Sequence, residues 1–327
     1  MRASRREWLM ALAGLALARG AGSQAPDGRM LSRRPLGRTG LSVSELGFGG
    51  AGIGGVAFGA VTEGEALDAL AAAADAGCNF IDTARIYGAS EVVLGKHLRS
   101  RKSHWIVASK YSGQKAGMRA TLEEQLTRLG VEAVDVYQIH WVPKGSEATL
   151  YEELYALRKE GKARFVGVSA ATRGDVDYVL ANTRLDTLQL PFNLLQPEPM
   201  IDALPALRRA GLGVIARSVL REGFLTGKFD ERQRFDPKKD VRGGLSPEKL
   251  AARLEDVEKF RWLQETTGSL ANAAIRYALS FDGIATALIG TKTAAQAREN
   301  FAPAARGALS PELLARIAGL QRTLTSA

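Results

Sequence analysis

The chain has 327 residues, of which 46% are hydrophobic and 24% are charged, and its formal net charge is +9. This is the composition of an ordinary soluble globular protein with ample material for a core, and the length is normal for one α/β barrel. A sequence pI of about 9.7 would suit a nucleic-acid-binding protein, but the basic residues are scattered and no binding module accompanies them. Nucleic acid is therefore excluded as an expected partner.

Residues 1–25 have the pattern of an export signal. A basic start precedes an apolar run from Trp8 to Ala18 that is too short to span a bilayer, and small residues follow. The sequence SRREWL at positions 4–9 resembles a twin-arginine signal, which predicts export to the periplasm by the twin-arginine machinery. Pro26 follows the candidate cleavage site, so one alternative is a membrane anchor formed by an uncleaved signal. The other alternative is a cytoplasmic protein with a frayed N-terminus or a misassigned start codon.

Leu31–Gly50 alternates polar and apolar residues around two glycines, as a β-hairpin followed by a strand would. Residues 47–52 then spell GxGxxG, a motif of dinucleotide-binding folds. That fold needs a helix directly after the last glycine, whereas more glycines follow here and a helical pattern starts only at Glu63. The candidate ribose-binding acid, Asp82, also lies beyond the expected interval of about 20 residues. We therefore interpret Gly49–Thr62 as a flexible loop at a barrel mouth, where Gly49 and Gly50 let the backbone approach a cofactor.

From Glu63 onward, helical and strand patterns alternate, and many helices end in a glycine. The expected strands are Leu46–Phe48, Phe80–Asp82, Ile106–Lys110, Val134–His140, Phe165–Ser169, Thr187–Pro191, Val214–Ser218 and Ile284–Ile289. The expected helices are 63–76, 90–98, 150–160, 174–182, 200–210 and 270–281, with one more ending near Gly130. This pattern predicts an α/β protein: a (β/α)8 TIM barrel over residues 31–327, with an N-terminal β-hairpin and a C-terminal helix.

Three of these strands end in residues that ionise or move protons: Asp82, with Tyr87 just after it, then Lys110, then His140. Barrel enzymes carry their chemistry at the C-terminal ends of strands, so we expect these four side chains to meet at one mouth. Taken singly, each residue type has an ordinary structural role, as a helix cap, a packing residue, a surface ion pair or a core histidine. Their convergence on one face favours catalysis.

These four groups suit proton transfer to a carbonyl. A tyrosine hydroxyl gives up its proton near neutral pH only if its pKa of about 10 falls toward 7, which costs about 4 kcal/mol. An ammonium about 4 Å away, at an effective dielectric constant near 20, supplies about that much. We therefore expect Lys110 to lower the pKa of Tyr87, while Asp82 holds the ammonium in place and cancels part of its effect. His140 would orient the substrate oxygen or relay the proton.

The segments FIDTARIYG at 80–88 and VDVYQIHW at 134–141 closely resemble sequence motifs of the aldo-keto reductases. The four residues above resemble the catalytic tetrad of that family, in the same order and on the same strand ends, and the similarity extends from about Leu36 to Asn300. The resemblance implies a TIM barrel that binds NADP(H) without a Rossmann domain. It also implies hydride transfer to or from a carbonyl, with Tyr87 as proton donor or acceptor.

The resemblance further implies which residues hold the cofactor. Ser169 and Gln189 match positions that bind the nicotinamide carboxamide, although Ala170 stands where the family often has asparagine. Arg217 stands where many members stack an aromatic residue on the nicotinamide, and a guanidinium can stack there as well. The other implied cofactor contacts are Gly50, Ser218, Leu220, Gly223, Gly290, Lys292, Gln296, Glu299 and Asn300.

Lys292 lies in a stretch, Gly290–Thr293, that would present backbone amides and a helix N-terminus to a phosphate. This places the lysine near the 2′-phosphate of NADPH; the alternative is an ordinary surface helix with a basic cap. Among the mouth loops that would choose the substrate, only Trp141 matches a recurrent family position. The insertion Phe229–Gly244 is charged, and a mobile lid and a solvated surface loop are equally consistent with it.

The two remaining histidines, His97 and His104, lie at or after a helix end, so we expect both to be solvated. No metal-ligand cluster and no nucleophilic serine or cysteine arrangement appears, so no metal is expected.

We thus expect an NADP(H)-dependent enzyme that interconverts a small-molecule carbonyl, such as an aldehyde, ketone or sugar, with an alcohol. An exported enzyme has no obvious source of fresh NADPH, which favours oxidation of a sugar or alcohol with a retained cofactor. One alternative is an NADP-binding regulatory protein with little turnover. Another is a lyase that uses Lys110 as a Schiff base, which the packing of Asp82 against that lysine disfavours.

Overall fold

The computed structural model describes residues 30–100, 105–196 and 200–324. In these ranges no helix has the length and apolar character needed to cross a membrane. The segment 1–25, for which the sequence predicts an export signal, lies outside the described residues, and so does His104.

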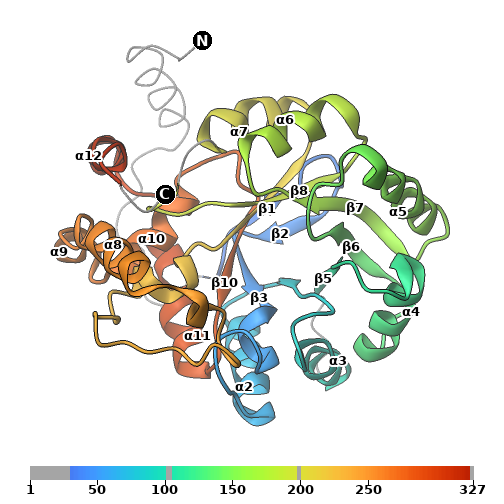
Figure 1. Ribbon diagram of the computed structural model, residues 1–327, viewed down its shortest axis with the longest axis horizontal. Helices are drawn as coiled ribbons and strands as arrows, with labels where there is room; N and C mark the ends of the chain where they lie inside the picture. Colours follow the sequence, from blue (N-terminus) through green and yellow to red (C-terminus); the bar gives the residue numbers. More distant parts are fainter. Residues whose placement is uncertain (1–29, 101–104, 197–199, 325–327) are drawn as a thin grey trace.

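Eight parallel strands form a closed barrel at the centre of the molecule, in the spatial order β10-β3-β4-β5-β6-β7-β8-β9 (Figure 1). They are β3 (Leu46–Gly49), β4 (Phe80–Asp82), β5 (Ile106–Tyr111), β6 (Val134–Ile139), β7 (Ala163–Ser169), β8 (Thr187–Pro191), β9 (Gly213–Arg217) and β10 (Thr286–Gly290). All eight lie where the alternating pattern placed them. The structure therefore confirms the predicted (β/α)8 TIM barrel.

Helices surround this barrel (Figure 1). They are α2 (Glu63–Asp75), α3 (Ser90–Ser100), α4 (Gly117–Leu129), α5 (Leu150–Lys159), α6 (Arg173–Asn182), α7 (Met200–Arg209), α10 (Leu270–Leu279) and α11 (Ala294–Phe301). Capping boxes at Thr62 and Thr172 start α2 and α6, because each threonine accepts a backbone N–H that the helix itself leaves unbonded. The insertion after β9 carries α8 (Pro247–Glu258) and α9 (Leu263–Thr267), and the predicted C-terminal helix is α12 (Pro311–Gln321).

An antiparallel hairpin of β1 (Arg33–Pro35) and β2 (Ser42–Ser44) covers the end at which the barrel strands begin. Its apolar residues, such as Leu36, pack in one buried cluster with inward-facing residues of the barrel strands. Arg34 is buried and forms an ion pair with Glu45 at 3.1 Å, and it also donates to two backbone carbonyls at 2.9 Å. Because the hairpin closes this end, a site can open only at the carboxyl ends of the strands.

Two local expectations differ from the structure. The stretch read as a flexible loop contains a largely buried 3-10 helix, Gly50–Gly54. A Cβ atom at Gly54 would lie 1.7 Å from the carbonyl oxygen of Tyr87, so this glycine is needed for close packing of two loops. His97, expected to be solvated, is only 2% exposed and packs edge-on against Trp105 with ring centroids 5.7 Å apart. The prediction was wrong because the last turn of α3 faces the start of β5 rather than solvent.

Candidate active site

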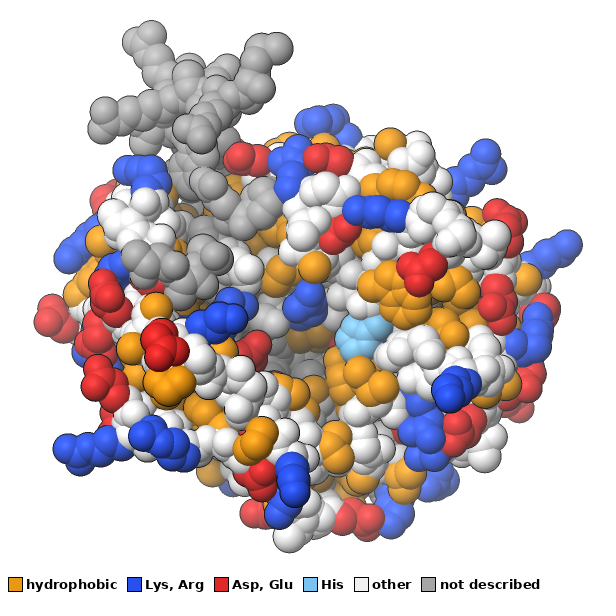
Figure 2. All heavy atoms as spheres, in the orientation of Figure 1, with side chains coloured by type: hydrophobic (Ala, Val, Ile, Leu, Met, Phe, Trp, Pro, Cys, Tyr) orange, Lys and Arg blue, Asp and Glu red, His pale blue; other side chains and the backbone are white. Residues whose placement is uncertain are grey.

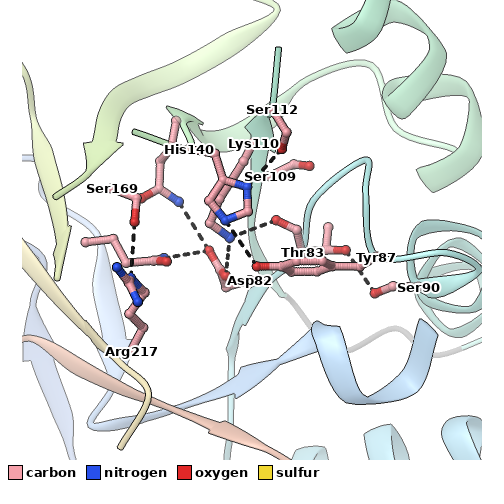
Figure 3. A network of polar contacts seen from close by, with 12 residues as sticks. Asp82, Thr83, Tyr87, Ser90, Ser109, Lys110, Ser112, His140, Ser169 and Arg217 are labelled. Atoms are coloured by element: carbon pink, nitrogen blue, oxygen red, sulfur yellow. Dashed lines mark hydrogen bonds and ion pairs between the residues drawn. The ribbon is translucent and has the colours of Figure 1, made fainter. Parts of the chain in front are cut away.

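The four predicted catalytic residues lie together at the carboxyl ends of neighbouring strands (Figure 3). Asp82 is the last residue of β4, Lys110 is the last but one of β5, and His140 directly follows β6. Tyr87 lies in the loop after β4. Because β4 pairs with β5 and β5 with β6, these three strand ends are side by side.

Polar contacts connect the four side chains. Lys110 Nζ forms a buried ion pair with Asp82 and donates to the carbonyl oxygen of Thr83 at 3.0 Å. The same Nζ lies 5.2 Å from the centroid of the Tyr87 ring. Tyr87 Oη lies 3.5 Å from His140 Nε2, so both atoms face one position where a substrate oxygen can bind (Figure 3). An ammonium held by a carboxylate is a poor nucleophile, which argues against Schiff-base chemistry at Lys110.

Asp82 is the centre of this network. Its Oδ2 accepts hydrogen bonds from Gln138 Nε2 at 3.2 Å and from Gln189 Nε2 at 2.9 Å. Gln189, which the resemblance assigned to the cofactor carboxamide, therefore also contacts the carboxylate of Asp82. Gln138 was missed by sequence reasoning, although it stands two residues before His140 and so points to the same side of the strand. Two amides and one ammonium thus surround the buried carboxylate and fix its orientation.

Burial and neighbouring charges set the protonation of the site. Burial raises the pKa of Tyr87 above 10.0, and the positive charge of Lys110 opposes this without overcoming it. The lowered tyrosine pKa that we expected is thus absent, because the expectation left out burial and because Asp82 offsets the lysine charge. Burial is the largest single influence on Lys110 and acts to lower its pKa, but charge attraction and hydrogen bonding to Asp82 and Tyr87 together outweigh burial, so the lysine pKa is raised. Burial, with Lys110 and Arg217 nearby, lowers the pKa of His140 to about 3, so this histidine is neutral at physiological pH.

Ser112 is a further polar residue that sequence reasoning missed. Its Oγ lies 2.8 Å from His140 Nδ1, on the side of the ring away from Tyr87 (Figure 3). A hydroxyl that donates to Nδ1 leaves the single ring proton on Nε2. In that tautomer His140 presents an N–H toward the substrate oxygen and cannot take the proton of Tyr87. The sequence gives a weak signal for this pair, since Ser112 follows Lys110 by two residues.

Replacing Ser112 with alanine is expected to lower kcat about tenfold, the equivalent of one lost hydrogen bond of about 1.4 kcal/mol. Threonine at this position keeps the hydroxyl and should retain most of the rate. Nitrogen NMR of the imidazole should show a proton fixed on Nε2 in the parent and a mixture of tautomers in Ser112→Ala. Unchanged imidazole signals in Ser112→Ala would contradict this role.

A cavity of about 660 Å³ opens at this face, between the tetrad and α11; Figure 2 shows the hollow at the centre of the face. Tyr87, His140 and Asp82 line one part of it. The predicted cofactor residues that line it are Ser169, Gln189, Arg217, Ser218, Leu220, Gly223, Gly290, Lys292, Gln296, Glu299 and Asn300. Residues from separate strand ends and from α11 are therefore brought to one cavity.

Three predicted site residues are not among those that line it: Lys110, which is fully buried, Gly50 and Trp141. Gly50 lies behind the wall, where a Cβ atom would come within 2.7 Å of Ser90 Oγ, while its neighbours Gly49 and Ala51 face the cavity. Trp141 lies beside the mouth, and its Nε1 donates to Glu147 at 3.0 Å.

The insertion Phe229–Gly244, which we call the strap, contacts the loop after β3. An isolated β-bridge joins Phe58 to Asp240, flanked by two backbone hydrogen bonds of 3.0 Å. The guanidinium of Arg242 forms an ion pair with Asp240 at 2.6 Å and lies within 5.4 Å of three aromatic ring centroids. Phe58 and Arg242 also line the cavity. Phe229, Val241 and Arg242 of the strap therefore form part of the cavity wall, while most of residues 230–239 are exposed.

The part of the cavity near α11 suits a phosphorylated nucleotide. Thr293 caps α11 by accepting from the backbone N–H of Gln296, and Lys292 directly precedes this cap. The lysine Nζ donates to the carbonyl oxygen of Phe58 at 2.9 Å, and within the part of the chain that the structure describes no carboxylate forms an ion pair with it. A cation beside a helix N-terminus favours an anion, and the cavity volume is in the usual range for cofactor sites. Within the described ranges, no group of three or more His, Cys, Asp or Glu side chains is placed to hold a metal ion.

The barrel and this site agree with comparisons to known proteins. The aldo/keto reductase family matches residues 45–322. The chain therefore belongs to the aldo/keto reductase family, whose members are oxidoreductases that generally use NAD(P)H and act on small-molecule carbonyls or alcohols.

Individual relatives are similar over most of the chain. L-galactose dehydrogenase of Arabidopsis thaliana is 32% identical over 258 residues, which cover 72% of this chain and 77% of the relative. The aldo-keto reductase YhdN of Bacillus subtilis is 29% identical over 263 residues, with the same two shares. Among solved structures, a glycerol dehydrogenase from Gluconobacter oxydans has a TM-score of 0.72 at 27% identity, covering 91% of this chain and 96% of its own.

Proposed function

We propose that the protein is an NADP(H)-dependent oxidoreductase that interconverts an aldehyde, ketone or sugar carbonyl with an alcohol. The observation that carries the proposal is the pairing of Tyr87 Oη with His140 Nε2, 3.5 Å apart, in a cavity that Lys292 also lines. A proton donor and an oxygen-binding group thus face the same space as a cation suited to a nucleotide phosphate.

Each residue of the tetrad has a separate task in this proposal. When bound, NADP(H) supplies or accepts the hydride. Neutral His140 donates Nε2–H to the substrate oxygen, and Tyr87 gives its proton to that oxygen in reduction or takes it back in oxidation. Lys110 stabilises the negative charge that develops on Tyr87, and Asp82 keeps the ammonium charged and in position. Because the pKa of Tyr87 is raised, its proton stays in place until a substrate oxygen begins to gain charge.

Sugars and polyols are the first substrates to test. One relative is named as an L-galactose dehydrogenase and one structural relative as a glycerol dehydrogenase. The experiment is a panel of sugars, polyols, aldehydes and ketones followed by NADPH absorbance in both directions, together with fluorescence titration of NADPH. Turnover supports the proposal. Tight binding without turnover would favour a regulatory NADP-binding protein, and a protein that binds no nucleotide would refute the cofactor assignment.

We also propose that residues 1–25 direct export to the periplasm by the twin-arginine route. The SRREWL sequence supports this. Replacement of Arg5 and Arg6 by lysine should keep the protein in the cytoplasm in a fractionation experiment. Export that continues at the parent level would contradict the proposal.

A further inference from the structure

At the Tyr87 end of the cavity, one positive charge forms no ion pair with any carboxylate of the described residues. Lys110 and Asp82 form a buried ion pair, so their charges offset each other. His140 is neutral because burial lowers its pKa to about 3, and the raised pKa of Tyr87 keeps the phenol neutral. What remains is the guanidinium of Arg217, which lines the same cavity.

Arg217 makes its hydrogen bonds to neutral oxygens. Its Nε donates to Ser169 Oγ at 3.2 Å (Figure 3). Its Nη2 donates to the carbonyl oxygen of Ala170 at 3.2 Å, and its Nη1 donates to Ser218 Oγ at 3.4 Å. Glu222, a nearby carboxylate, is paired with Arg253 at 3.0 Å. Among the described residues, no carboxylate forms an ion pair with Arg217. A guanidinium keeps its proton, so the charge is permanent.

The position of the cofactor ring follows from the proposed function, on which this inference rests. A hydride can move only if the reacting ring carbon lies in contact with the substrate carbon, about 3–3.5 Å away. The oxygen on that substrate carbon is bound by Tyr87 and His140. The nicotinamide must therefore lie at the same end of the cavity as Arg217.

We propose that Arg217 makes the site distinguish the two redox states of the cofactor and bind NADPH more tightly than NADP⁺. The oxidised ring carries a positive charge that the reduced ring lacks, so the guanidinium repels only the oxidised form. Screening is weaker in a buried site than in water, which strengthens the repulsion.

The same repulsion favours alcohol oxidation within the bound complex. In that reaction a hydride moves from the carbinol carbon to the ring, and the hydroxyl proton leaves through Tyr87 to solvent. The positive charge of the ring disappears beside Arg217. Arg217 therefore shifts the equilibrium between the two bound complexes. It favours the complex of carbonyl and NADPH over the complex of alcohol and NADP⁺, compared with a site that lacks this charge.

Dissociation constants of NADPH and NADP⁺, measured by calorimetry at low ionic strength, test the proposal. Arg217→Gln removes the charge but keeps a donor for Ser169, and it should reduce the preference for NADPH by about tenfold. Arg217→Lys keeps the charge and should retain most of the preference. Lys292→Gln is the matched control. It removes a charge near the proposed phosphate position, so it should weaken the binding of NADPH and of NADP⁺ by the same factor.

An unchanged affinity ratio in Arg217→Gln, with both forms still bound, would overturn this inference and leave the proposed function intact. The same drop in the ratio for Arg217→Lys and Arg217→Gln would point to lost packing rather than lost charge, and would also overturn it. Failure of the parent protein to bind either form would refute the proposed function itself, and the inference with it.

Discussion

Replacing Tyr87 with phenylalanine is expected to lower kcat by about 100- to 10,000-fold, the usual contribution of a positioned general acid or base. The substitution removes only the hydroxyl that faces His140 Nε2 at 3.5 Å. Cofactor affinity should stay close to the parent value, because the groups suited to the nucleotide lie elsewhere along the cavity. Steady-state rates in both directions, with NADPH titrations on the same preparations, provide the measurement.

The matched control is Tyr178→Phe. This tyrosine lies on α6, outside the cavity, where Lys144 Nζ packs 5.6 Å from its ring centroid. Removal of its hydroxyl should leave both kcat and cofactor binding near the parent values. A Tyr87→Phe enzyme that kept the parent rate would show that this hydroxyl does not transfer the proton, and would contradict the role proposed for Tyr87.

The barrel and the tetrad were predictable because they depend on regular patterns along the chain. Strand and helix periods repeat from Glu63 onward, and parallel strands bring their carboxyl ends to one face. A residue at such an end, like Asp82 or Lys110, is therefore placed by its own strand. The predicted cofactor contacts came from the resemblance to the aldo-keto reductases, and most of these residues line the cavity that the structure shows.

Contacts between loops were not predictable in the same way. Ser112 reaches His140, and the strap reaches Phe58, because of how separate loops fold over the mouth. The periodic pattern of the sequence does not predict contacts of this kind between loops. The pKa of Tyr87 was misjudged for a related reason, since burial depends on neighbours from several strands and is its largest cause. His97 likewise looked solvated until the packing of Trp105 was known.

The ion pair of Asp82 and Lys110 is expected to behave as one unit in unfolding experiments. Their side chains are 4% and 0% exposed, so a single substitution leaves one buried charge without its partner. Asp82→Asn and Lys110→Met should each reduce the free energy of unfolding by about 3–5 kcal/mol. The double variant should lose clearly less than the sum of the two, because no unpaired charge remains. Urea unfolding followed by circular dichroism at neutral pH gives all four values.

Lys96→Met is the control for this cycle, because Lys96 pairs with Glu63 at the surface, where the two side chains are 46% and 51% exposed. Solvent screens that pair, so its loss should have little effect on stability. Strictly additive losses for the Asp82 and Lys110 variants would contradict the coupling.

Activity should not follow stability in the double variant of Asp82 and Lys110. Removing both charges restores much of the fold, but it also removes the ammonium 5.2 Å from the Tyr87 ring, which the proposed reaction needs to stabilise a developing phenolate. We therefore expect the double variant to be folded and to have a kcat at least about 100-fold below the parent. Such a result would mean that a stable barrel does not require this pair, and that the pair is retained for the chemistry at Tyr87. A folded double variant with parent activity would remove Lys110 from the proposed mechanism.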